Sequence, residues 1–302
     1  MTDGSRGFPI LRRLRRVTPA AVLVACLLPA TGCVDSEAVS KFATQAHDAL
    51  TLGQPVLEDL AESCIRAHVA EAPVPADKFK LFDPNLRATA AADPACVGFA
   101  QDQPGELAIL KVLTDYFGAL SQLAATGTTA TGKSTSSSAE TAQKNPGETQ
   151  DVLKAVSGLA GFLGKVASNG YRERALEKAL RDQKDNVDAV IGALREIVQN
   201  RYENTELKTE QQVITRADGD LLGANDDTAT KALLRAQWQN SMDLIDKKQA
   251  AADAFVKALD TMQQGYDALS NTPSLKAKDV PSLVQPYTDS LSSLIPSIEK
   301  AL

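Results

Sequence analysis

AAADAFVKALDTMQQGYDALS, residues 250–270, carries an apolar side chain at every third or fourth position. The stripe consists of Ala252, Phe255, Leu259, Met262, Tyr266 and Leu269. This spacing puts the six side chains on one face of an α-helix, because the helix repeats every ~3.6 residues. The seven-residue rhythm is also that of a coiled coil. The pattern extends back to about Thr228, which predicts a helix about 60 Å long.

A second helix of similar length is predicted from about Tyr171 to Gln212. Its apolar seam consists of Leu176, Leu180, Val187, Val190, Leu194 and Ile197. The connecting stretch DGDLLGANDDT, residues 218–228, is compact, and Asp227 is placed to cap the helix that follows. We therefore predict a long antiparallel, coiled-coil-like hairpin. Leu221 and Leu222 would lie at its tip, where they either dock into a partner or fold back over the helix ends.

Helical spacing also dominates the rest of the chain. It appears between Val39 and Ala67, between Leu107 and Leu120, and from about Pro281 to Ile298. A Pro-rich connection separates the first two, and residues 125–150 have the composition of a flexible, low-complexity loop. The predicted fold class is all-α: an elongated helical bundle over residues 33–302.

The first 32 residues have the pattern of an export signal. A basic start, with Arg12, Arg13, Arg15 and Arg16, precedes an apolar run that is too short to span a bilayer. Ala30-Thr31-Gly32-Cys33 follows, and the whole resembles a bacterial lipoprotein signal peptide, although Ala30 stands where Leu is commonest. The resemblance implies that residues 1–32 are a cleaved signal peptide and that Cys33 carries lipid. Ordinary secretion with cleavage near Gly32, or a retained anchor, are the alternatives.

The resemblance also implies a location in the bacterial envelope. Val34 follows Cys33 in place of the Asp that resembles an inner-membrane retention signal, so we expect an outer-membrane anchor facing the periplasm. Without residues 1–32 the chain holds 27 basic and 37 acidic residues, a formal charge of −10. A chain this acidic lacks the excess of Lys and Arg that is typical of nucleic-acid-binding proteins, so we expect no nucleic-acid partner. Its negative charge would also repel anionic lipids, so we expect the protein to attach to the membrane through the acyl chain on Cys33.

Two cysteines remain in the mature chain besides Cys33. In an oxidising compartment a disulfide between Cys64 and Cys96 is the expected outcome. The alternative is metal binding, because Cys64 and His68 are spaced four residues apart on a predicted helix. Two candidate ligands with no second pair nearby make a weak zinc site, so no metal is expected.

GTTATGKS, residues 127–134, satisfies the G-x-x-x-x-G-K-[ST] pattern of phosphate-binding loops. Such a loop works by joining a buried strand to the N-terminus of a helix, so that backbone amides converge on the phosphates. Here the preceding residues have the pattern of an amphipathic helix, and the following ones are a Ser-rich linker. We therefore predict a flexible loop, with no nucleotide and no other cofactor.

Residues 152–168, VLKAVSGLAGFLGKVAS, combine apolar side chains with glycine at every third position. Each glycine costs a helix about 1 kcal/mol relative to alanine, so some other interaction should offset Gly158, Gly161 and Gly164. Close helix packing is the favoured explanation. Insertion of this segment, including Phe162, into a bilayer is the other.

No set of catalytic residues can be assembled from the sequence. His47 and His68 are the two histidines, and both fall on the first predicted helix. The nucleophile-elbow and zinc-protease motifs do not occur in the sequence. We predict a non-enzymatic envelope lipoprotein that acts by protein contact, as scaffold, adaptor or inhibitor. A membrane-active helical protein of the pore-former type, and an envelope hydrolase, are the alternatives.

Overall fold

Helices make up nearly all of the described part of the chain in the computed structural model, which confirms the all-α class. The structure describes residues 36–71, 84–126, 134–144, 147–169, 173–224, 227–275 and 279–301. These residues belong to one compact unit, Cys33–Leu302. The predicted signal peptide and lipidation site, residues 1–32 and Cys33, lie outside the described residues.

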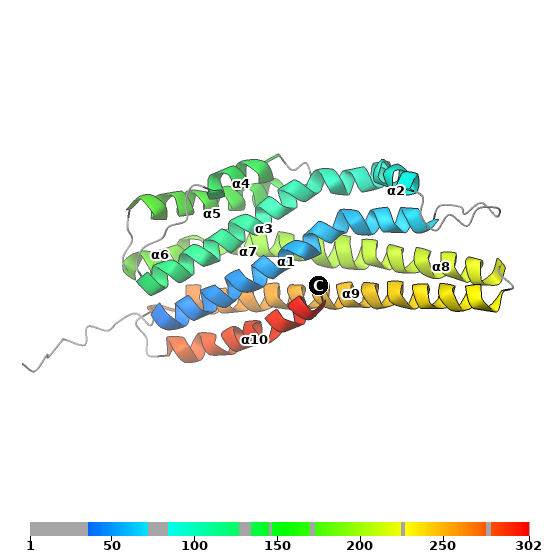
Figure 1. The fold of residues 1–302 in the computed structure, drawn as a ribbon. Coiled ribbons are helices and arrows are strands. Elements are labelled where there is room, and N and C mark those ends of the chain that lie inside the picture. The colour runs from blue at the N-terminus through cyan, green and yellow to red at the C-terminus, as the bar shows by residue number, and fades with distance from the viewer. Residues whose placement is uncertain are drawn as a thin grey trace, which may run out of the picture. The chain divides into compact units, whose positions relative to one another are not determined.

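The elements follow one another along the chain as shown in Figure 1. Their bounds are α1 (Ser36–Glu71), α2 (Pro84–Ala91), α3 (Pro94–Thr126), α4 (Ser134–Ala142), α5 (Gln150–Asn169), α6 (Glu173–Asp182), α7 (Lys184–Glu196), the π-helix η1 (Ile197–Leu207), α8 (Lys208–Ala224), α9 (Thr228–Ser270) and α10 (Val280–Ala301). Asp227 caps α9 as predicted, because its carboxylate accepts a hydrogen bond from the backbone N–H of Thr230 at 2.6 Å.

Helix α1 packs against α3, α9 and α10 and supplies much of the core. Two glycines allow α1 and α9 to approach closely, and each receives an aromatic ring from the other helix. A Cβ atom on Gly53 of α1 would overlap the ring of Phe255, and one on Gly265 of α9 would overlap the ring of Phe42. The reciprocal pair fixes how far one helix can slide along the other.

Buried aromatic residues join α3, α6 and α9 at one end of this core. The hydroxyls of Tyr116 and Tyr266 lie 2.6 Å apart, and the Tyr266 hydroxyl donates to the carbonyl of Leu180 at 3.0 Å. Because a hydroxyl has one proton to give, Tyr116 must be the donor to Tyr266. Both rings are fully buried, and the pair leaves neither hydroxyl unsatisfied.

The stretch predicted as one helix from Tyr171 to Gln212 is divided. A turn at Gln183 separates α6 from α7, and η1 interrupts the α-helix between Ile197 and Leu207. A π-helix has more residues in each turn than an α-helix, so a strict heptad seam cannot run through it. The apolar pattern continues across both interruptions. Leu180 and Val187, on either side of Gln183, are buried, and so are Leu194 and Ile197, where α7 passes into η1.

The segment α7–η1–α8 contacts α9 through residue pairs. As the residue number rises along the segment, the number of the partner in α9 falls. Arg195 pairs with Asp260 at 2.8 Å, and the hydroxyl of Thr215 lies 3.9 Å from the sulfur of Met242. In Figure 1, α8 and α9 run side by side. The long antiparallel, coiled-coil-like hairpin as a whole stays a prediction.

The loop predicted at residues 125–150 is a helix in part. Ser134–Ala142 form α4, which packs beside α3 and α5 (Figure 1). Ala139 and Ala142 are buried there, and small side chains allow such a short helix to lie close to its neighbours. The prediction of a loop rested on low-complexity composition, and it was wrong for this part because a Ser- and Ala-rich segment can still form a helix with a buried face.

Candidate functional site

Cys64 on α1 and Cys96 on α3 form a disulfide, as predicted. His68, one helical turn after Cys64, lies beside it. The two sulfurs and a ring nitrogen of His68 all lie within 4.8 Å of one another. Both cysteines are buried, whereas about a third of the His68 side chain is exposed. The cluster therefore combines a buried sulfur pair with an imidazole that reaches solvent.

Asp93 lies beside this imidazole, and Glu206 interacts with it electrostatically. Asp93 precedes α3, and its Oδ1 accepts the backbone N–H of Ala95 at 2.9 Å while its Oδ2 lies 3.7 Å from Nδ1 of His68. Glu206 of η1 is almost fully buried; burial raises its pKa, and a positive charge on His68 opposes that shift. His68 therefore lies close to the sulfurs of Cys64 and Cys96 and to the carboxylate of Asp93.

A second polar group, here called the Arg201 cluster, consists of Asp102, Glu106, Glu148 and Arg201. The Arg201 guanidinium pairs with Glu106 and lies 3.1 Å from Asp102. It also stacks 5.4 Å from the ring centroid of Phe99. Glu106 is fully buried, and its Oε2 has no hydrogen-bond partner.

Burial raises the pKa of Glu106 to about 7; Arg201 opposes this, and the charges of Asp102 and Glu148 add to it. Burial likewise raises the pKa of Glu148. One arginine facing three carboxylates leaves an excess of negative charge, which a proton on Glu106 would relieve. The sequence did not predict this cluster. The available signal was that Glu106 continues the buried stripe of Leu110, Leu113 and Phe117 by one step of four.

Asp59 and Arg66, also on α1, belong to a polar network in which the charged groups are paired. Arg66 bridges Asp59 at 2.7 Å and Glu210 at 2.5 Å. The Tyr202 hydroxyl donates to Asp59 at 2.8 Å, and Lys248 reaches the same carboxylate at 3.0 Å. Every charge in this network has an opposite partner, so it ties α1, η1, α8 and α9 together and offers no open ligand position.

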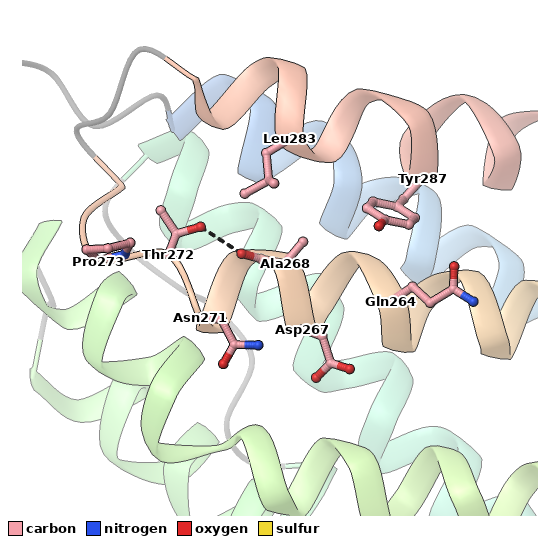
Figure 2. A pocket seen from close by; sticks show the side chains of 8 residues that line it. All are labelled: Gln264, Asp267, Ala268, Asn271, Thr272, Pro273, Leu283 and Tyr287. Carbon is pink, nitrogen blue, oxygen red and sulfur yellow. Dashed lines mark hydrogen bonds between the residues drawn. The ribbon is translucent and has the colours of Figure 1, made fainter.

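An open depression lies where α9 ends beside α10. Figure 2 shows Leu283 and Tyr287 projecting from α10 toward α9, while the side chains of Asp267 and Asn271 turn to the other side of α9. Asp267 is already paired with Lys184. The polar groups do not converge on one point, which a specific small-molecule site requires.

The glycine-rich segment forms α5, which packs against α3, α4 and α7. A Cβ atom on Gly158 would lie 2.5 Å from Nδ2 of Asn186, whereas Gly161 and Gly164 have nothing within 4 Å. The Phe162 ring lies 5.7 Å from that of Tyr116. Gly158 and Phe162 therefore take part in packing within the bundle, and bilayer insertion of α5 has no support from these contacts.

The predicted tip leucines, Leu221 and Leu222, are both half-buried on α8. The largest exposed apolar side chains in the described part of the chain lie elsewhere. Leu233 is 73% exposed and Leu244 is 48% exposed, both on the first half of α9. Eleven residues make about three helical turns, so the two leucines share one face, called here the Leu233 face.

The candidates for catalysis and nucleotide binding are the two histidines and residues 127–134, of which the structure describes only a part. His47 contacts Asp48 at 3.2 Å and is not hydrogen-bonded to a serine. Residues 127–133 of the phosphate-loop pattern lie outside the described residues. The elements on either side are both helices, α3 and α4, so the strand that normally precedes such a loop is replaced by a helix.

One described helix, α3, is long and apolar enough by composition to cross a membrane, but 61% of the relevant window is buried inside the bundle. Its core contacts with α1 account for that apolar character. Comparison of the chain with protein-family models, curated proteins and solved structures finds no match.

Proposed function

We propose that this protein is a lipid-anchored protein of the bacterial envelope, attached through Cys33 to the outer membrane and facing the periplasm, that acts by contact with a protein partner rather than by catalysis. The anchor rests on the resemblance of residues 1–33 to a lipoprotein signal peptide. The contact role rests on the Leu233 face of α9.

The Leu233 face supports a role in partner binding because its two leucines contribute little to the core of the bundle. Leu234 and Ile245, their immediate neighbours, are buried and hold α9 in place. Leu233 and Leu244 instead keep most or about half of their surface in water, which costs free energy that a binding partner would recover. The two leucines lie about three turns apart on the same side of α9, so one partner surface can contact both at once.

Site-specific photo-crosslinking in living cells tests this proposal. A photoreactive residue at position 233 or 244 should give a discrete crosslinked product with one envelope protein. The same residue at Lys257, an exposed polar position on the inner half of α9, serves as control and should not give that product. Absence of a specific product from both leucine positions would refute the contact surface.

Leu233→Ser with Leu244→Ser provides the matched functional variant. The pair should reduce capture of the crosslinked partner while leaving the melting temperature within error, since both side chains are already solvated. Leu283→Ser, which changes an exposed leucine on α10, should leave capture unchanged. Equal loss of capture in both variants would show that the effect is not specific to this face.

A further inference from the structure

Cys64, Cys96 and His68 form a group with the ligand chemistry of a zinc site. Their sulfur and nitrogen atoms lie within 4.8 Å of one another, although they come from two helices. Zinc is held by thiolates at about 2.3 Å and by imidazole nitrogen at about 2.0–2.1 Å, so atoms in one first coordination shell lie within this mutual distance. The present disulfide keeps the sulfurs from acting as thiolates.

The surroundings of His68 supply a second, independent observation. An imidazole that binds metal through one nitrogen usually donates its other N–H to a carboxylate, which fixes the ring and its tautomer. Asp93 Oδ2 lies 3.7 Å from Nδ1 of His68, and Oδ1 of the same carboxylate is held by the backbone of α3. Asp93 thus lies on the Nδ1 side of the ring, beyond hydrogen-bond distance. A shift that closes this distance would let Nδ1 donate to Asp93 and leave Nε2 for a metal.

We propose that Cys64, Cys96 and His68 bind one Zn²⁺ when the disulfide is reduced, so that the same three residues alternate between a covalent and a metal-mediated link from α1 to α3. Water would fill the fourth position, as in other sites with three protein ligands. Asp93 acts as a positioning residue for His68 and not as a ligand.

The chemistry balances with a dithiol reductant, either a small molecule or a thioredoxin-like protein. The reductant gives two electrons and two protons to the Cys64–Cys96 bond, yielding two thiols, and itself becomes a disulfide. Zinc then displaces one proton from each thiol, so that both sulfurs bind as thiolates. Because the cysteines are buried, the reductant reaches the bond when the start of α3 opens locally.

The test uses the chain from residue 33 onward with Cys33→Ser, since residues 33–302 form one compact unit and this change removes the third thiol. The protein is reduced without oxygen, freed of reductant and titrated with Co²⁺ as a spectroscopic probe. We expect a thiolate-to-cobalt charge-transfer band that saturates at one equivalent and is abolished by one equivalent of Zn²⁺. The oxidised protein should show no band.

Two variants identify the ligands. His68→Ala should weaken Co²⁺ binding by at least about tenfold, while His47→Ala, which changes the other histidine of the chain, should leave it unchanged. Asp93→Asn should weaken binding by about 10–100-fold, the usual effect of losing an outer-shell carboxylate. A His68→Ala variant that binds Co²⁺ as tightly as its parent would overturn the proposal.

Loss of folding on reduction is also informative. If the reduced chain loses helix content by circular dichroism, Co²⁺ or Zn²⁺ added during refolding should restore it, because metal binding then contributes directly to folding. The double variant Cys64→Ser, Cys96→Ser is the control and should gain nothing from metal. Reduced protein that shows neither a charge-transfer band nor recovery of helix would refute the site.

Discussion

Glu106 on α3 and Arg201 in η1 form an ion pair that leaves one oxygen of the Glu106 carboxylate buried and without a partner. The two residues are 95 positions apart and join the first half of the chain to the second. An unsatisfied buried carboxylate oxygen is costly, and protonation reduces that cost. The pair therefore makes the stability of the fold depend on pH.

The first prediction concerns that dependence. The pKa of Glu106 is raised from 4.5 to about 7 on folding, so the folded chain binds the proton more tightly than the unfolded chain. The resulting stability is fully present below about pH 4.5 and is lost as pH rises through about 7, up to about 3 kcal/mol. Glu106→Gln should remove this part of the pH slope in urea unfolding.

The control for this experiment is Glu299→Gln, which changes an exposed carboxylate on α10 and should keep the parent slope. Comparing each variant with the parent from pH 4.5 to 8 cancels the other titrating groups. An unchanged slope in Glu106→Gln would mean that Glu106 stays ionised in the fold.

A second prediction follows from the glycine positions. Gly53→Ala should destabilise the protein by about 1–3 kcal/mol, because the new methyl group would overlap the ring of Phe255. Gly161→Ala should instead stabilise it by up to about 1 kcal/mol, since that helical position is open and alanine favours helix. Urea unfolding of both variants measures the difference. Equal effects of the same sign would contradict the close approach of α1 and α9.

The third prediction compares the loss of stability caused by changing core leucines with that caused by changing Leu221 and Leu222 near the end of α8. Leu194 and Leu259 are fully buried, and truncating either to Ala should cost about 2–5 kcal/mol through lost transfer free energy and cavity formation. Leu221→Ser with Leu222→Ser should cost much less, because both side chains are already half exposed. Thermal unfolding distinguishes the two outcomes. A large loss from the tip variant would assign those leucines to the core.

The fourth prediction tests the proposed anchor. Metabolic labelling with a fatty-acid analogue should mark the parent protein and not Cys33→Ser, since that thiol is the proposed site of lipid attachment. The labelled parent should fractionate with the outer membrane. Equal labelling of both proteins would remove the lipoprotein assignment without affecting the disulfide or the fold.

Local spacing was enough to predict the main helices and the cap at Asp227, because both depend on residues a few positions apart. It did not predict α4, whose buried face consists of small side chains, or the turn at Gln183. The disulfide could be predicted because two cysteines leave one pairing within the mature chain. The Arg201 cluster could not be predicted, since nothing near Arg201 in sequence shows that Asp102 and Glu106 lie opposite it. The π-helix was missed because residues 197–207, IVQNRYENTEL, carry no local signal that distinguishes its wider turns from those of an α-helix.

Gly53 faces the ring of Phe255, and Gly265 faces the ring of Phe42. These two contacts limit which substitutions the sequence can accept as it evolves. A larger residue at Gly53 needs a smaller residue at Phe255, so these two positions should change together in related chains. At Gly265 an added Cβ atom would also lie 3.1 Å from the Cβ of Tyr287, so a smaller residue at Phe42 relieves only part of the overlap. Gly53→Ala combined with Phe255→Leu should accordingly be less harmful than the sum of the two single changes.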